Sequence, residues 1–87
     1  ENKLQRRLKM KNREYQEYNL IHARDTVYDL QRSLRINQEK INKAIENRDF
    51  ETFEKVSKEV TQILKWLGMQ EWRVAYLEEE LKEELND

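Results

Sequence analysis

The sequence predicts an all-α protein, and three observations lead to that prediction. The 87 residues contain no proline and only one glycine, Gly68, so little in the chain interrupts a helix. Apolar residues recur every three or four positions, which is the spacing of one helix face. Charged residues make up 40% of the chain and hydrophobic residues 37%, so any core must be a narrow seam between helices. We expect a small antiparallel bundle of three or four helices with a long N-terminal helix.

Two apolar stripes follow each other in the first half of the chain. The first comprises Leu4, Leu8, Tyr15, Tyr18 and His22. The second comprises Leu20, Val27, Leu30, Leu34, Ile41 and Ala44. They are out of phase around Thr26, and such a slip bends a helix, rotates its buried face or ends it. We predict one helix over about 3–32 and a second piece over about 33–46, continuous with the first or kinked near Ser33. The pattern leaves open whether the first stripe is buried or exposed.

The second half of the chain begins at the best turn signal, residues 47–49. Asp49 is a good N-cap because its carboxylate accepts the free amides of the following turn. The next helix, over about 50–67, is expected to bury Phe53, Val56, Val60, Ile63, Leu64 and Leu67. Gly68 suits a left-handed cap that ends it. A last helix over about 70–85 would pack back on the antiparallel hairpin formed by about 36–67.

Length and composition set the outer limits. Residues 1–87 fit one small domain, and self-association could supply the rest of its core. The chain does not begin with methionine, so we expect a piece of a longer protein. The absence of cysteine excludes a disulfide framework and thiolate zinc sites. No apolar run approaches the roughly 20 residues that span a membrane, and no secretory signal opens the chain, which favours an intracellular location and no membrane partner.

Charge is distributed unevenly although the formal net charge is only −1. Residues 1–24 contain seven basic and three acidic side chains, 7 − 3 = +4, and residues 71–87 contain two basic and seven acidic ones, 2 − 7 = −5. These two ends could attract each other within one molecule or between two. The plainer interpretation is a pair of solvated helix faces, because exposed ion pairs contribute little.

Few residues suggest catalysis or metal binding. His22 is the only histidine, and with Asp25 it could form an acid–base pair on one helix face. A lone histidine on an apolar stripe is more often a packing residue. The acidic run of residues 78–80 with Glu83 and Glu84 lacks the glycine-containing loop of a calcium site. We predict no enzyme activity, no catalytic residue, no metal and no cofactor.

A basic segment near the N-terminus raises the question of nucleic-acid binding. Its members are Arg6, Arg7, Lys9, Lys11 and Arg13, followed by Tyr15 and Tyr18. Such residues could follow a phosphate backbone while the tyrosines stack on bases. We favour a basic face whose side chains reach solvent, with the tyrosines packed in a seam, and expect no nucleic-acid partner.

The most apolar surroundings of a predicted turn contain two tryptophans. The plainer interpretation is that Trp66 and Trp72 close the end of the bundle. The alternative is a partner-binding patch of Trp66, Met69, Trp72 and Tyr76, because exposed aromatic residues are typical of binding hot spots.

Short stretches near both ends carry a family resemblance. Residues 4–8 (LQRRL), 11–12 (KN) and 17–20 (EYNL) are followed, near the other end, by 54–55 (EK), 66–67 (WL) and 76–81 (YLEEEL). This order resembles the C-terminal helical lid of the Hsp70/Hsp110 chaperone family. In addition, residues 20–22 (LIH) are similar to a Leu-Leu-His step in the lid of bacterial members, where the histidine lies near a latch. The resemblance implies a latch of His22, Arg24 and Asp25.

A second resemblance competes with the first. Residues 45–51 (IENRDFE) are similar to the helical hairpin in the C-terminal domain of Hsc20-type cochaperones, which grips a client. Two functions follow as expectations. The first is a non-enzymatic lid subdomain of an Hsp70-like chaperone, which would modulate the release of a client peptide from a substrate-binding domain. The second is a helical protein–protein interaction or oligomerisation module that uses the tryptophan patch and could form a homo-oligomer.

Overall fold

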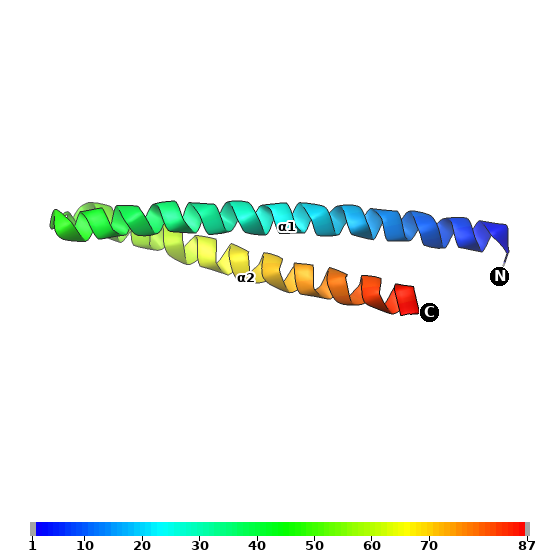
Figure 1. The fold of residues 1–87 in the computed structure, drawn as a ribbon. Coiled ribbons are helices and arrows are strands. Elements are labelled where there is room, and N and C mark those ends of the chain that lie inside the picture. Colours follow the sequence, from blue (N-terminus) through cyan, green and yellow to red (C-terminus); the bar gives the residue numbers. More distant parts are fainter. Residues whose placement is uncertain (1, 87) are drawn as a thin grey trace.

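The computed structural model describes residues 2–86 and consists of two long helices joined by a tight turn (Figure 1). Helix α1 spans Lys3–Glu46 and helix α2 spans Phe50–Asn86. They run antiparallel and side by side, forming a rod with extents of 68 × 15 × 14 Å. The all-α prediction is confirmed. The predicted bundle of three or four helices is wrong, because the described residues form only two.

Helix α1 continues without interruption through the predicted boundary between 3–32 and 33–46. It begins at a capping box, in which the Gln5 amide donates to the Asn2 side chain at 2.8 Å and the Asn2 amide donates to the Gln5 side chain at 3.2 Å. No kink is needed near Ser33, since the two apolar stripes occupy different faces of one helix. A change of stripe therefore marks a change of buried face and not the end of a helix.

Helix α2 also merges two predicted helices, 50–67 and 70–85. The expected cap at Gly68 is wrong, because this residue has no positive φ angle and lies inside the helix. A glycine in a helix interior costs only about 1 kcal/mol relative to alanine. The apolar spacing continues across it through Leu67 and Val74, so packing against α1 holds the helix together there. The last segment consequently does not fold back on the hairpin.

The turn at residues 47–49 is confirmed. The Asp49 Oδ1 atom accepts the backbone amide of Thr52 at 3.2 Å, and the Thr52 hydroxyl donates to Asp49 Oδ2 at 2.6 Å. These bonds make Asp49 the N-cap of α2. Arg48 takes the left-handed conformation, with φ of 54°, that reverses the chain.

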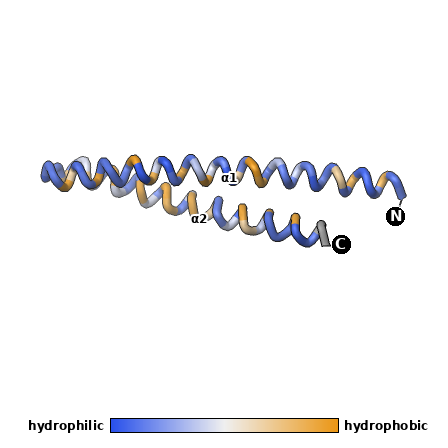
Figure 2. Tube along the Cα trace, in the orientation of Figure 1, coloured by the Kyte–Doolittle hydropathy of each residue, from blue (hydrophilic) through white to orange (hydrophobic). Residues whose placement is uncertain are grey.

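The core is a single seam between the helices. Positions on α1 alternate steps of three and four residues: Leu20, Ala23, Val27, Leu30, Leu34, Asn37, Ile41 and Ala44. Positions on α2 do the same: Val56, Val60, Ile63, Leu67, Gln70, Val74, Leu77 and Leu81. This is the pattern of a two-stranded antiparallel coiled coil, and Figure 2 shows the recurrence of apolar residues along both helices. The second stripe predicted from the sequence is thus the α1 side of the seam.

Candidate interaction surfaces

Both tryptophans are exposed on the surface of α2. Trp66 is 51% exposed, Met69 66%, Trp72 70% and Tyr76 50%. We call these four residues the outer α2 patch. The expectation that the tryptophans close a bundle end is therefore wrong, because α2 runs straight on past Gly68 and leaves them on its surface.

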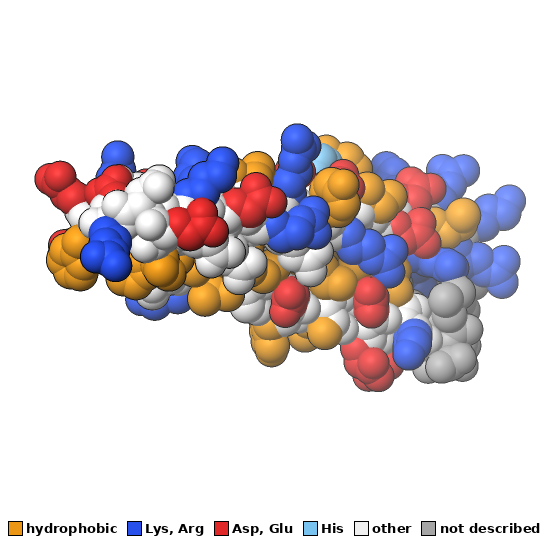
Figure 3. All heavy atoms as spheres, turned by 60° about the vertical axis from the view of Figure 1, so that its left-hand side comes forward, with side chains coloured by type: hydrophobic (Ala, Val, Ile, Leu, Met, Phe, Trp, Pro, Cys, Tyr) orange, Lys and Arg blue, Asp and Glu red, His pale blue; other side chains and the backbone are white. Residues whose placement is uncertain are grey.

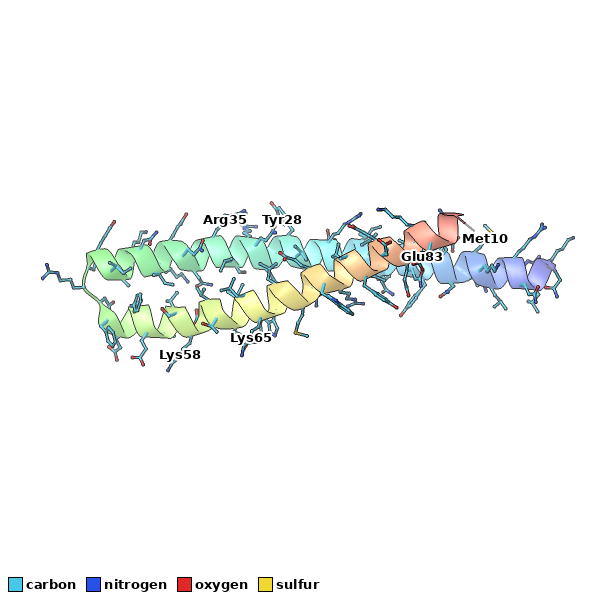
Figure 4. All side chains as sticks on the ribbon, turned by 90° about the horizontal axis from the view of Figure 1, so that it is seen from below. Met10, Tyr28, Arg35, Lys58, Lys65 and Glu83 are labelled. Carbon is cyan, nitrogen blue, oxygen red and sulfur yellow. The ribbon has the colours of Figure 1, made fainter. Side chains whose placement is uncertain are left out.

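The direction of the patch follows from helix geometry. Trp72 is two residues from both Gln70 and Val74, which are seam positions, and two residues turn a helix by about 200°. Trp72 therefore points away from α1. Lys58 and Lys65, which precede it at seven-residue intervals, also point away from α1 in Figure 4. Glu79 continues the same line, so the outer face of α2 changes from basic to apolar to acidic along the helix.

The aromatic rings of the patch are held in place by local contacts. Trp72 and Tyr76 stack with their ring centroids 5.6 Å apart and their planes 13° from parallel. A hydrogen bond from the Tyr76 hydroxyl to the Glu80 carboxylate, together with the negative charge of Glu80, raises the pKa of Tyr76 because both favour the neutral phenol. Beside the rings is a shallow, open hollow lined by Gly68, Met69, Gln70, Trp72 and Arg73. A Cβ atom added at Gly68 would meet nothing within 4 Å, so no contact inside the chain requires a glycine there.

The first stripe forms a second exposed surface, which we call the N-terminal stripe: Leu4, Leu8, Tyr15, Tyr18 and His22. Leu4 is 64% exposed, Leu8 59%, Tyr15 64% and Tyr18 58%. Tyr18 is two residues from Gln16 and from Leu20, so it points away from α2 by the same geometry as Trp72. Its ring packs edge-on against His22 with centroids 4.3 Å apart. The structure thus answers what the sequence left open, since the N-terminal stripe does not pack inside the hairpin.

The antiparallel arrangement brings the basic and acidic ends of the chain together. Arg24 pairs with Glu78 at 3.0 Å, and the Gln16 amide donates to Glu80 at 2.9 Å. Figure 3 shows Lys and Arg side chains gathered at the end of the rod where α1 begins. The Arg24 and Glu78 side chains are about half exposed, so this ion pair contributes little to stability. Its main effect is to favour the antiparallel alignment of α1 and α2.

The residues predicted as a latch do not converge on one point. Arg24 reaches across to α2, whereas the His22 ring packs on Tyr18 along α1. The described hydrogen bonds include none between His22 and Asp25. Among the residues that the structure describes, no group of three His, Cys, Asp or Glu side chains could hold a metal ion. The described helices also include none long and apolar enough to cross a membrane.

No family model, no curated protein and no solved structure matches this chain. The chaperone-lid interpretation therefore stays a prediction that rests on the short stretches quoted above. Its direct test is peptide release from a parent chaperone, which should be faster after His22→Ala. The Hsc20-type interpretation likewise stays a prediction.

Proposed function

We propose that this chain is a non-enzymatic helical interaction module, whose outer α2 patch binds an amphipathic helix of another protein. One observation supports the proposal above the others. Four large apolar side chains, three of them aromatic, stand 50% to 70% exposed within residues 66–76 of a regular helix. Scattered exposed apolar residues are common, but a contiguous aromatic group is typical of a binding site.

The shape of the patch suits a helix as the partner. Residues 66–76 cover about 15 Å along α2, which is nearly three turns of a partner helix. The hollow at Gly68 allows close approach beside Trp72, and Ala75 continues this line of small residues. A partner side chain that enters the hollow would contact Met69 and Trp72, as a ridge enters a groove in helix packing.

The charges beside the patch select the partner and its direction. Lys58 and Lys65 flank the patch toward the turn, and Glu79 and Glu83 flank it toward the open end. A bound helix is therefore expected to place acidic residues opposite the lysines and basic residues opposite the glutamates. Complementary charges of this kind chiefly set orientation and association rate.

The experiment begins with a photoreactive amino acid at Met69, introduced in the cell that makes the protein. A matched probe at Tyr28, which points away from α2 on the outer side of α1 (Figure 4), controls for unspecific contacts. The protein captured at Met69 and not at Tyr28 is then purified, and its affinity is measured by calorimetry. Trp72→Ala should weaken that binding about 30-fold, as for a hot-spot aromatic, while Tyr28→Ala should leave it unchanged.

Two results would count against the proposal. One is a purified partner that binds Trp72→Ala as tightly as the wild type. The other is capture at Met69 of nothing but a second copy of this chain, which would make the patch a contact between identical subunits.

A further inference from the structure

Residues 3–13 of α1 form a helical segment with two opposite faces, one basic and one apolar. Leu4 and Leu8 each lie two residues from Arg6, and two residues turn a helix by about 200°, so both leucines point away from Arg6. Arg13 shares the face of Arg6, because seven residues make about two turns. The two leucines are 64% and 59% exposed. A helix that is basic on one side and apolar on the other is typical of segments that lie on a membrane surface.

The same segment carries positive charge only. Its six charged side chains are all basic and all exposed: Lys3, Arg6, Arg7, Lys9, Lys11 and Arg13. Arg13 pairs with Glu17 at 3.2 Å. In the part of the chain that the structure describes, Arg6, Arg7 and Lys11 take part in no ion pair. Their positive charges are therefore left for an anionic partner outside the hairpin.

Helix α2 does not block the apolar face of this segment. It lies beside α1 at Gln16, whose amide donates to Glu80 at 2.9 Å, on the opposite side of α1 from the N-terminal stripe. Tyr15 follows Leu8 by two turns and is 64% exposed, so it extends the apolar face by one ring of the kind that settles among lipid headgroups. Lys11 lies in the same line, and its long stem carries the ammonium group out of an apolar layer to the headgroups.

Acidic side chains confine an anionic partner to this end of the rod. Beyond residue 13, the neighbouring parts of α1 and α2 contain Glu14, Glu17, Asp25, Glu78, Glu79, Glu80 and Glu83. A negatively charged surface repels these carboxylates, so the rod would rest on it by the basic end only. The outer α2 patch, with Trp72 directed away from α1, would then face away from that surface.

We propose that residues 3–15 bind the surface of an anionic lipid membrane. Leu4, Leu8 and Tyr15 enter the boundary between headgroups and acyl chains, while the basic side chains contact lipid phosphates and carboxylates. A nucleic acid would engage the basic face and leave both leucines in water, whereas a lipid surface accommodates both faces of the helix. The sequence predicted no membrane partner because no segment is long enough to span a bilayer, but a helix that lies in the interface needs no spanning segment.

Co-flotation of the full chain with lipid vesicles tests the proposal. The wild type should bind vesicles of phosphatidylcholine mixed with phosphatidylserine, and less so as salt rises, but should bind pure phosphatidylcholine weakly. Arg7→Gln with Lys11→Gln should weaken this binding at least about tenfold, since each basic residue near an anionic surface contributes about fivefold. The matched control is Lys58→Gln with Lys65→Gln, on the side of α2 that points away from α1 (Figure 4), which should change binding less than about twofold.

A second measurement tests which face enters the lipid. The chain contains no cysteine, so an environment-sensitive fluorophore on Leu8→Cys or on Met10→Cys reports one position at a time. These positions are 59% and 64% exposed and lie two residues apart, on opposite faces of the same basic segment. The emission of the Leu8→Cys label should shift to the blue on anionic vesicles, and that of the Met10→Cys label should not. Circular dichroism of each variant verifies that the hairpin stays folded.

Three outcomes would overturn this inference. They are equal binding to neutral and anionic vesicles, binding that is unaffected by Arg7→Gln with Lys11→Gln, and a Leu8→Cys label that does not shift on bound vesicles. A short DNA duplex that binds more tightly than anionic vesicles at the same salt would also overturn it, by assigning the basic face to nucleic acid. A Leu8→Cys label that shifts with rising protein concentration, without vesicles, would assign the apolar face to a second copy. None of these variants alters the outer α2 patch, so a failure here leaves the proposed partner of that patch untouched.

Discussion

The two apolar stripes of α1 have the same kind of spacing, but one is buried against α2 and the other is exposed. Leu20, in the seam, is 7% exposed, whereas Tyr18, two residues before it, is 58% exposed. The seam is built mainly of Leu, Val, Ile and Ala, with polar residues only at Gln16, Asn37 and Gln70 among the described seam positions. The N-terminal stripe instead includes two tyrosines and a histidine, whose polar ends suit a wet interface. The spacing of apolar residues therefore reveals an apolar stripe on a helix. The types of side chain in the stripe indicate whether it is buried within the hairpin.

The difference between the stripes should be largest in their contribution to folding. Leu77 is 7% exposed and packs in a cluster with Leu20, Ala23 and Leu81. We expect Leu77→Ala to lower the free energy of unfolding by about 2–4 kcal/mol, because it leaves a cavity in a narrow seam. Tyr18→Ala should change it by less than about 0.5 kcal/mol in dilute protein. Urea unfolding, monitored by circular dichroism, measures the free energy of unfolding of both variants. Equal losses in Leu77→Ala and Tyr18→Ala would contradict the distinction between a buried seam and an exposed stripe.

A second test concerns the polar positions inside the seam. Asn37 occupies a partly buried seam position, and its amide donates to the Ser33 carbonyl of its own helix at 3.0 Å. Because this bond does not cross the seam, Asn37→Leu should raise the free energy of unfolding by about 1–2 kcal/mol. Asn42→Leu, at an exposed position, controls for helix propensity and should change the free energy of unfolding by only about a few tenths of a kcal/mol. A loss of stability in Asn37→Leu would mean that the amide serves the pairing of the two helices.

Much of this architecture was predictable from the sequence, and the failures have a common origin. Residues 47–49 were identified as the turn because the capping chemistry of Asp49 is local. Near Ser33 the continuous alternative holds and the kink does not, and the helix end predicted at Gly68 is wrong. In both places continued packing along the seam outweighs a phase slip or one glycine. The outer α2 patch was named among the alternatives, but its exposure follows from α2 continuing straight, which no local signal indicates.

The turn at residues 47–49 sets which stripe of α1 packs against α2. Weakening the Asp49 cap should therefore destabilise the seam without altering the outer α2 patch or the N-terminal stripe. Asp49→Ala removes the acceptor of two Thr52 hydrogen bonds and should lower the melting temperature by about a few degrees at neutral pH. The hydrogen bonds to the Thr52 hydroxyl and amide lower the pKa of Asp49 in the folded chain. Its contribution is therefore complete above the unfolded pKa of about 3.9 and is lost as the pH falls through the lower folded value.

Melting curves of wild type and Asp49→Ala from neutral to acidic pH measure this contribution. The two melting temperatures should converge in acid as the wild-type carboxylate becomes protonated. A gap that stays constant down to pH values well below the unfolded pKa would show that the cap does not act through its charge.

Gly68 gives the smallest expected effect, and its sign decides between the two descriptions of α2. If Gly68 ended a helix in the left-handed conformation, Gly68→Ala would destabilise the chain. In the observed continuous helix it should stabilise it by about 0.5–1 kcal/mol, since alanine is the better helix former and its Cβ meets nothing within 4 Å. The added methyl group also narrows the hollow beside Trp72, so stability and affinity for a partner helix should change in opposite directions. Urea unfolding and calorimetry on one pair of proteins, wild type and Gly68→Ala, measure both. If Gly68→Ala is more stable than the wild type but binds the partner helix equally well, α2 is a continuous helix and the hollow is not part of the binding surface.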